Sequence, residues 1–133
     1  MRKVHLINTN KRNNPNCEVE MLINQKCSAY FRDWHTYVEK IQTGDIVFLY
    51  STEVGIIARG IATGIVEKAD YQGHIDAECY MYLDRFERLK TPLTAAKIKE
   101  ASGIDVVFGV TVFTFANYEN GLKVWQHITK HNL

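Results

Sequence analysis

The segment Ile46-Val47-Phe48-Leu49-Tyr50 constrains the fold more than any other part of this sequence. A strand with one solvated face alternates polar and apolar residues, whereas this segment has no polar face and is typical of a strand covered on both sides. After the turn 51–55, residues 56–66 again resemble a strand but contain two interior glycines. Interior glycines mark bends or bulges. We therefore predict a central strand in a sheet that curls toward a barrel.

The remaining segments predict additional strands and helices around this sheet. Apolar and aromatic residues between Cys27 and Ile41 follow the i, i+3, i+4, i+7 spacing of an amphipathic helix. Thr91 and Pro92 can open a short helix that Gly103 ends. Strands are expected at 4–7, 79–86 and 106–115, and a last helix from 117. The strands follow one another too closely for regular parallel crossovers. We expect an α+β fold, a small curled mixed β-barrel with flanking helices, and residues 1–133 as a single domain.

Composition limits the function classes. With 46% hydrophobic residues among 133, the chain can bury one core. Sixteen basic against fifteen acidic side chains leave a net charge of +1, which excludes a global attraction to nucleic acid, so any such site must be local. The three cysteines form no CxxC pair, which favours reduced thiols. No run approaches the roughly 20 apolar residues that span a bilayer. We expect a cytoplasmic protein without a membrane partner.

A polar loop between residues 8 and 16 is the first candidate binding element. Five of its nine residues are asparagine, and a carboxamide offers both a donor and an acceptor to the edge of a heterocycle. Two neighbouring cations could hold a phosphate beside it. A turn-rich solvated loop is the alternative, since asparagine also favours turns. The candidate binding residues here are Asn8, Thr9, Asn10, Lys11, Arg12 and Asn13.

A second group of candidates lies on the following segments. Trp34 could stack on a base or pack in the core. Tyr50, Ser51 and Thr52 lie where the apolar strand ends, a position from which side chains often face a pocket, although the last two are also ordinary turn residues. Gly55 permits either a close ligand approach or a hairpin turn.

Catalytic and metal-binding motifs are not recognisable in this sequence. It has no GxSxG, P-loop or GxGxxG motif. His127 and His131 have the i, i+4 spacing of two zinc ligands but lack the HExxH glutamate. We therefore predict no catalytic residue, no metal and no cofactor, and favour a binding role over an enzymatic one.

The core "GDIVFLYST...GIIARGIATG", after the opening path Val4 to Asn10, resembles the EVE-like branch of the PUA-like superfamily, which is related to YTH and ASCH domains. The resemblance implies a curled mixed sheet with flanking helices and a pocket that accepts a base. It places Asn8, Thr9 and Asn10 at the rim, Trp34 beside it, and residues 50–52 opposite. The sequence departs from the YTH pattern in the first strand, where Leu6 or Ile7 stands in place of a tryptophan.

The leading hypothesis is a nucleic-acid-binding module that flips out and holds one base, expected to be modified, of DNA or RNA. A separate nuclease or modification-system protein would be its partner, because the chain has no room for a nuclease domain. The first alternative is an RNA-binding accessory domain of the PUA or ASCH type. The second is a small nucleoside amidohydrolase, for which Lys26, Thr52 and Glu53 would be the converging set.

Overall fold

The computed structural model describes residues 2–133, with the side chains of residues 32–35 outside that description. Its seven strands form one sheet in the order β2-β6-β4-β3-β1-β7, with β5 paired to β6. The strands are β1 Val4–Asn8, β2 Lys26–Tyr30, β3 Ile46–Ser51, β4 Gly55–Ala62, β5 Glu67–Tyr71, β6 His74–Leu93 and β7 Val112–Thr114. The helices are α1 Pro15–Asn24, α2 Arg32–Glu39, α3 Ala95–Ser102 and α4 Tyr118–His131.

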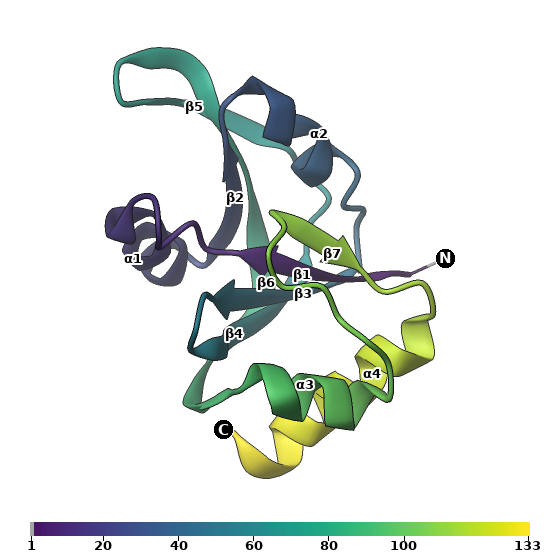
Figure 1. The fold of residues 1–133 in the computed structure, drawn as a ribbon. Coiled ribbons are helices and arrows are strands. Elements are labelled where there is room, and N and C mark those ends of the chain that lie inside the picture. Colours follow the sequence, from purple (N-terminus) through teal and green to yellow (C-terminus); the bar gives the residue numbers. More distant parts are fainter. Residues whose placement is uncertain (1) are drawn as a thin grey trace.

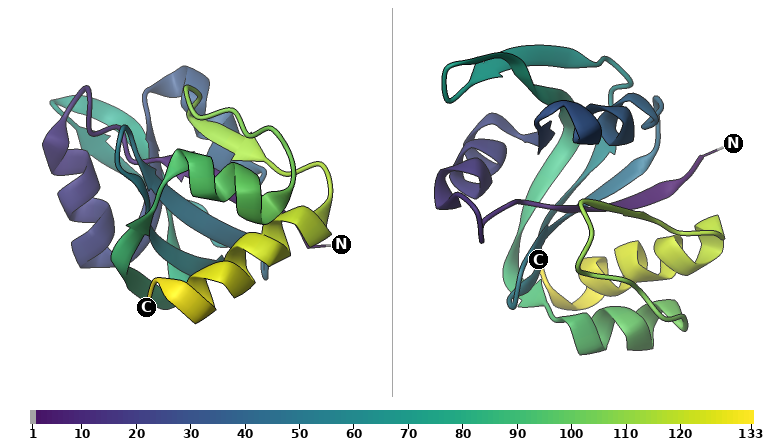
Figure 2. Two further views of the ribbon diagram at one scale, coloured as in Figure 1. Left: turned by 60° about the horizontal axis from the view of Figure 1, so that its bottom comes forward. Right: turned by 45° about the horizontal axis from the view of Figure 1, so that its top comes forward.

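The sheet is mixed and strongly curled, forming a half-barrel with helices around it (Figures 1 and 2). The strand β1 runs parallel to β3, while the other pairs are antiparallel. The α+β class and the curled mixed sheet are therefore confirmed. Among the helices of residues 2–133, none combines the length and the apolar character that crossing a bilayer requires.

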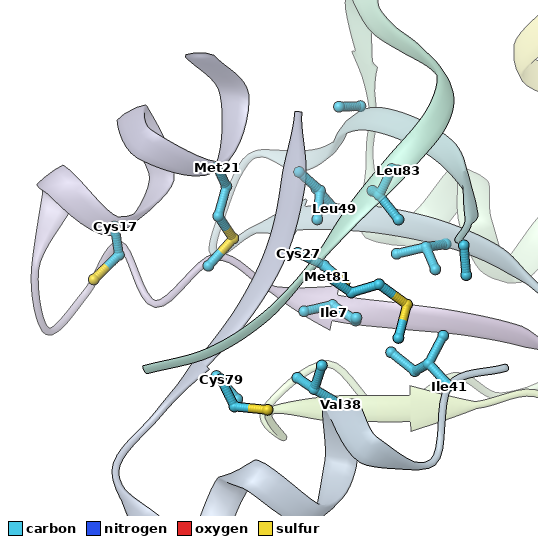
Figure 3. Packing of buried hydrophobic residues seen from close by; sticks show 14 of the residues in the cluster. Ile7, Cys17, Met21, Cys27, Val38, Ile41, Leu49, Cys79, Met81 and Leu83 are labelled. Carbon is cyan, nitrogen blue, oxygen red and sulfur yellow. The ribbon is translucent and has the colours of Figure 1, made fainter. Parts of the chain in front are cut away.

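Strand β3 is apolar because both faces of the sheet are covered. Val47 and Leu49 belong to a core that also contains Met21 of α1 and Val38 of α2 (Figure 3). The alternate residues of β3, such as Phe48, belong to a second core with residues from α3 and α4. Side chains of a strand point alternately to opposite faces, so a strand between two cores has no position for a polar residue. The prediction that this segment lies inside the sheet is confirmed.

The curl comes from the long strand β6. Its first part pairs with β2 and β5, and its second part pairs with β4. The register between β4 and β6 shifts on both sides of Ala58 and Arg59, next to Gly60. A Cβ atom at Gly60 would lie 2.8 Å from the Cβ of Leu83 on β6, so only glycine allows this close approach. The sheet does not close, and β2, β5 and β7 each pair with a single other strand among the described residues.

The predicted helix over 27–41 is wrong in its first part. Lys26–Tyr30 forms strand β2, and the helix α2 occupies only Arg32–Glu39. All five residues of β2 are buried, so they carry no alternating pattern. Their partners lie about fifty positions away on β6, and this pairing overrides the local helical spacing. Phe31, with a φ of +69°, separates the strand from the helix.

Other boundaries also differ from expectation. The polar loop ends earlier, because Asn14 caps α1 and Pro15 is its first residue. The third helix is capped by Thr94, since Thr91 and Pro92 remain in β6. The last strand is confined to residues 112–114, and the strands β5 and β2 were not anticipated. The last helix begins where it was predicted, with Asn117 as its cap.

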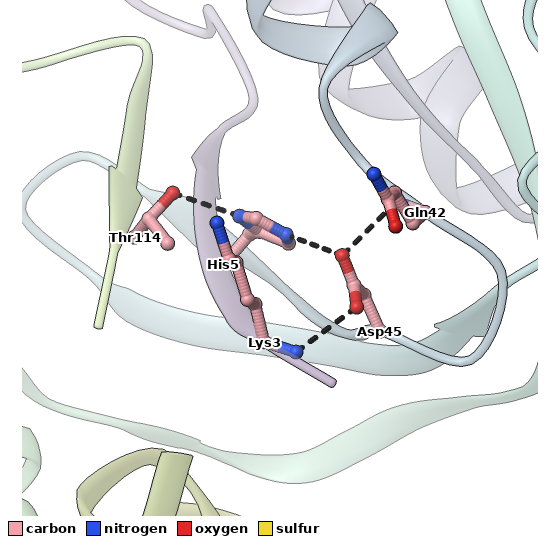
Figure 4. A network of polar contacts seen from close by, with 5 residues as sticks. All are labelled: Lys3, His5, Gln42, Asp45 and Thr114. Carbon is pink, nitrogen blue, oxygen red and sulfur yellow. Dashed lines mark hydrogen bonds and ion pairs between the residues drawn. The ribbon is translucent and has the colours of Figure 1, made fainter. Parts of the chain in front are cut away.

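A buried polar network fastens β1 to its neighbours. The His5 ring contacts Asp45 Oδ2 through Nε2 and Thr114 Oγ1 through Nδ1, each at 2.8 Å (Figure 4). The Asp45 carboxylate also accepts the backbone N–H groups of Lys3 and Gln42. Burial lowers the pKa of His5 below its ordinary value. The network therefore joins β1, the turn before β3, and β7 without leaving the carboxylate unpaired.

Candidate binding cleft

A cleft of about 530 Å³ lies where the half-barrel stays open, between the edge strand β2 and the loop that leads into β7. This volume is within the range of small-molecule sites. The ends of β1 and β3 and the polar loop complete its walls. The lining residues are Asn8, Asn10, Arg12, Asn13, Ser28, Ala29, Tyr30, Tyr50, Thr52, Glu53, Phe108, Gly109, Val110 and Thr111.

The polar loop is organised by its own hydrogen bonds. The side chain of Asn8 donates to Thr52 Oγ1 at 3.1 Å and accepts the backbone N–H of Asn10 at 2.8 Å. Asn13 donates to the side-chain oxygen of Asn10 at 2.7 Å, and the carbonyl of Asn10 accepts two further backbone N–H groups. Asn10 adopts a left-handed φ of +62°, which asparagine tolerates well. The loop therefore presents its amides in a fixed arrangement at the cleft.

The amides retain capacity for a ligand. A carboxamide has two N–H donors and two acceptor lone pairs, and the contacts of Asn8 use one of each. The hydroxyl of Thr52 accepts from Asn8, so its own proton is available to another acceptor. The cleft can thus read both a donor and an acceptor on a planar ligand edge.

An aromatic wall faces these amides within the same cleft. Tyr50 and Phe108 stack with ring centroids 4.9 Å apart and an interplanar angle of 27°. Tyr50 is buried and Phe108 is half-buried. Burial raises the pKa of the Tyr50 hydroxyl, which keeps it neutral near pH 7. The first strand adds no aromatic side chain to this cleft. Its residues Leu6 and Ile7 are aliphatic and are buried in the two cores.

The charged lining residues neutralise each other. Among the lining residues, only Arg12 and Glu53 carry a charge, and Arg12 Nη2 lies 3.0 Å from Glu53 Oε1. Both side chains are largely exposed, so the ion pair adds little stability and is easily exchanged for another partner. The cleft is therefore suited to a neutral ring system, with Arg12 available to an anion at its mouth.

Six of the eleven predicted site residues line this cleft, namely Asn8, Asn10, Arg12, Asn13, Tyr50 and Thr52. Lys11 is half-buried but is not a lining residue. The side chain of Trp34 lies outside the described residues.

Three further predicted residues do not line the cleft. Thr9 is fully buried and donates to Glu18 Oε1 of α1 at 2.7 Å. Ser51 is buried outside the cleft lining. Gly55 has a φ of +131°, and a Cβ there would overlap the carbonyl group of Leu93. None of the three lines the cleft, since Thr9 bonds to α1 and Gly55 packs against β6, and their role in binding stays a prediction.

Sequence reasoning missed the wall formed by β2. Ser28 lies on this wall, and its hydroxyl donates to Glu78 Oε2 at 2.8 Å. The same carboxylate oxygen lies 2.8 Å from Lys26 Nζ, and all three residues are buried. Tyr30 adjoins them, and burial raises the pKa of its hydroxyl. The expected set of Lys26, Thr52 and Glu53 does not converge in the cleft, because Lys26 pairs with Glu78 instead.

The loop 108–111 was also missed, since it was expected to continue a strand. A phenylalanine followed by glycine is compatible with either structure, and no local signal separates them. The positions of Ser28 and Glu78 are brought together only by the pairing of β2 with β6. An alternating reading of residues 26–30 would have found Lys26, Ser28 and Tyr30 on one strand face.

The fold defines the class of this protein as an α+β half-barrel, and solved structures share it. A hypothetical protein from Leishmania major has a TM-score of 0.66 at 8% identity, covering 98% of this chain and 96% of that protein. A Pseudomonas syringae protein has a TM-score of 0.53 at 11% identity, covering 94% and 99%. A Rhodopseudomonas palustris protein, determined by NMR, has a TM-score of 0.51 at 16% identity, covering 96% and 91%.

These likenesses establish the fold, which is compatible with a PUA-like architecture. No protein-family model matches the sequence, and no curated protein matches it by sequence.

Proposed function

We propose that this chain is a nucleic-acid-binding module that holds one base, extruded from its strand, in the cleft between β2 and the 108–111 loop. The proposal rests on one observation: hydrogen-bonded asparagine side chains and two stacked aromatic rings line the same cleft, and its two charged residues pair with each other. A base is a neutral, planar group with donors and acceptors on its edge, so these are the properties that would recognise it.

The expected affinity is modest. Extruding a base costs a few kcal/mol, and each good stack on an aromatic ring returns about 1–3 kcal/mol. Stacking and extrusion nearly cancel, so recognition of the base edge decides whether binding occurs. A modification that adds a hydrogen-bonding or apolar group at that edge would then have a large effect on affinity.

The resemblance of the "GDIVFLYST...GIIARGIATG" segment to EVE-like domains supports this role and a modified base as the ligand. Because the first strand supplies no tryptophan, the aromatic contribution would come from Tyr50 and Phe108. Arg12 would contact a phosphate next to the extruded nucleotide after exchange of its partner Glu53. A separate nuclease or modification-system protein would use the bound module as its recognition subunit.

Fluorescence anisotropy with short oligonucleotides tests the proposal. DNA and RNA carrying 5-methylcytosine, 5-hydroxymethylcytosine or N6-methyladenine are compared with unmodified strands at a stated salt concentration. Phe108→Ala should weaken binding of the preferred modification about 5- to 150-fold, the equivalent of one stack. Phe86→Ala is the control, since Phe86 is also half-buried but lies outside the cleft lining.

Equal affinity for all modified and unmodified strands would contradict base reading. Steep salt dependence without base selectivity would instead indicate an RNA-binding accessory domain of the PUA or ASCH type.

A second candidate, hydrolysis of an N-acyl nucleoside, is favoured by the contacts of Ser28. A hydroxyl that donates to a buried carboxylate can lose its proton to that carboxylate as it attacks a carbonyl. The acyl group would pass to Ser28 Oγ as the C–N bond breaks, and the exocyclic nitrogen would leave as an amine with the proton held by Glu78. Water would then release the acyl group as a carboxylic acid. Lys26 would balance the charge of Glu78 between the two steps.

Incubation with N4-acetylcytidine and chromatography for cytidine separates the two functions. Turnover that disappears in Ser28→Ala, while the unfolding temperature is kept, would favour hydrolysis. Absence of cytidine after prolonged incubation would remove this candidate and leave the binding function.

A further inference from the structure

A second cleft, of about 470 Å³, lies on the far side of the sheet from α1, where the end of β6 meets the start of α3 and the end of α4. Helices α3 and α4 lie side by side there, with the C-terminus close to the beginning of α3 (Figures 1 and 2). The lining residues are Pro92, Leu93, Thr94, Lys97, His127, His131 and Asn132. None of them lines the first cleft.

Two residues that line this cleft each have a buried polar atom without a hydrogen-bond partner. These atoms are Nδ1 of His127 and Oδ1 of Asn132, two of four such side-chain atoms in the part of the chain that the structure describes. Asn132 is only 7% exposed. Its side-chain nitrogen donates to the carbonyl of Thr91 at 3.0 Å, which fixes the opposite orientation of its oxygen. Unpaired buried polar atoms are costly, so their presence in one cleft points to a missing ligand.

The two histidines have the spacing of a chelating pair. Their ring centroids are 4.6 Å apart, with an interplanar angle of 49°. Two imidazoles that bind one metal ion through nitrogens at about 2.0–2.1 Å place their ring centres about 4.5–5.2 Å apart for right-angled to tetrahedral geometry. The observed separation falls within this range. The helix therefore holds the rings close to a metal-binding arrangement before any ion is bound.

The unpaired atoms suit a cation and not an anion. An amide oxygen can only accept, and so can Nδ1 of a neutral histidine that carries its proton on Nε2. The C-terminal end of α4 also carries a partial negative charge, which favours a cation. Lys97 opposes it, but its side chain is 57% exposed and lies 3.6 Å from Glu100. It can therefore turn away toward its acidic neighbour.

We propose that His127, His131 and Asn132 form a binding site for a divalent transition metal of the class that prefers imidazole, Zn²⁺, Ni²⁺ or Cu²⁺. The residues described contain no cluster of three or more His, Cys, Asp or Glu side chains, so the amide oxygen is the third protein ligand and water completes the shell. The sequence predicted no metal because the histidine pair lacks the HExxH glutamate. The third ligand is Asn132, whose orientation only the contact with β6 fixes.

Isothermal titration of the chelator-treated full chain with each metal chloride, without nucleic acid, tests the site. His131→Ala is the main variant, because His131 is exposed and its replacement spares the core. It should weaken binding at least tenfold, whereas His74→Ala, at another exposed histidine, should leave binding unchanged. Lys97→Gln should tighten binding, because it removes a positive charge from the cleft.

Unchanged metal affinity in His131→Ala, or no heat of binding at millimolar metal, would overturn the proposal. Binding of inorganic phosphate that Lys97→Gln weakens would show an anion site instead. These measurements do not involve the first cleft, so their outcome is independent of base recognition.

Discussion

Replacing Glu78 by glutamine keeps the shape of a buried side chain but removes its charge. Glu78 contacts Lys26 Nζ and the hydroxyl of Ser28, each at 2.8 Å, and the side chains of Lys26 and Glu78 are 10% and 5% exposed. Removing one partner of a buried ion pair leaves the other charge uncompensated, which costs about 3–5 kcal/mol. We expect Glu78→Gln to lower the free energy of unfolding by this amount, and the unfolding temperature by roughly 10–20 °C.

The double variant Lys26→Met/Glu78→Gln isolates the cause. Without the lysine, no charge is left unpaired, so most of the lost stability should return. Urea unfolding of the wild type, both single variants and the double variant gives the coupling free energy. Additive losses in the double variant would refute the reasoning, because they would mean that the pair contributes no mutual stabilisation. A folded double variant also lacks the carboxylate that the proposed hydrolysis would use, so it separates stability from that chemistry.

Three other expectations concern the fold. Gly55→Ala should lower the free energy of unfolding in urea by about 3 kcal/mol or more, because the added Cβ would overlap the backbone of Leu93. Gly73 also has a positive φ, but no atom lies within 4 Å of an added Cβ, so Gly73→Ala should cost about 1–2 kcal/mol. Burial lowers the pKa of His5 below 6.5, so the unfolded chain binds the proton more tightly than the folded chain. The free energy of unfolding should therefore fall as the pH drops below 6.5, and His5→Gln should flatten this pH dependence. Burial raises the pKa of Cys27 to about 12. Iodoacetamide at pH 8 should therefore modify Cys27 only after unfolding, and mass spectrometry measures the modification.

The candidate residues that line the cleft were found from local chemistry. A carboxamide can donate and accept hydrogen bonds in any fold, and an apolar run is buried in any fold, so the sequence alone indicated the asparagines and the end of the apolar strand. Asn8, Asn13 and Thr52 accordingly line the cleft. Thr9 and Ser51 are buried next to lining residues but do not line the cleft, and only the tertiary structure decides which of two neighbouring side chains faces it.

The β2 wall could not be predicted in the same way. Residues 26–30 have a spacing that fits a helix, but they are held as a strand by β6, and Glu78 reaches Ser28 only through that pairing. Likewise, Asn132 became a candidate ligand only when α4 was seen to end against β6. Contacts between distant segments leave no periodicity in either segment, so neither segment alone contains the information.

The amino-acid order by itself determined that the apolar strand lies inside the sheet, that the glycine-containing strand after it allows the sheet to curl, and that an amide-rich loop follows the first strand. Hydrophobic burial and backbone freedom fix these features locally, residue by residue. Only the tertiary structure decided where the sheet stays open, which side chains face that opening, and which polar groups are left buried without a partner. Those properties depend on how strands fifty residues apart align, and free energy from packing both faces of the sheet selects that alignment.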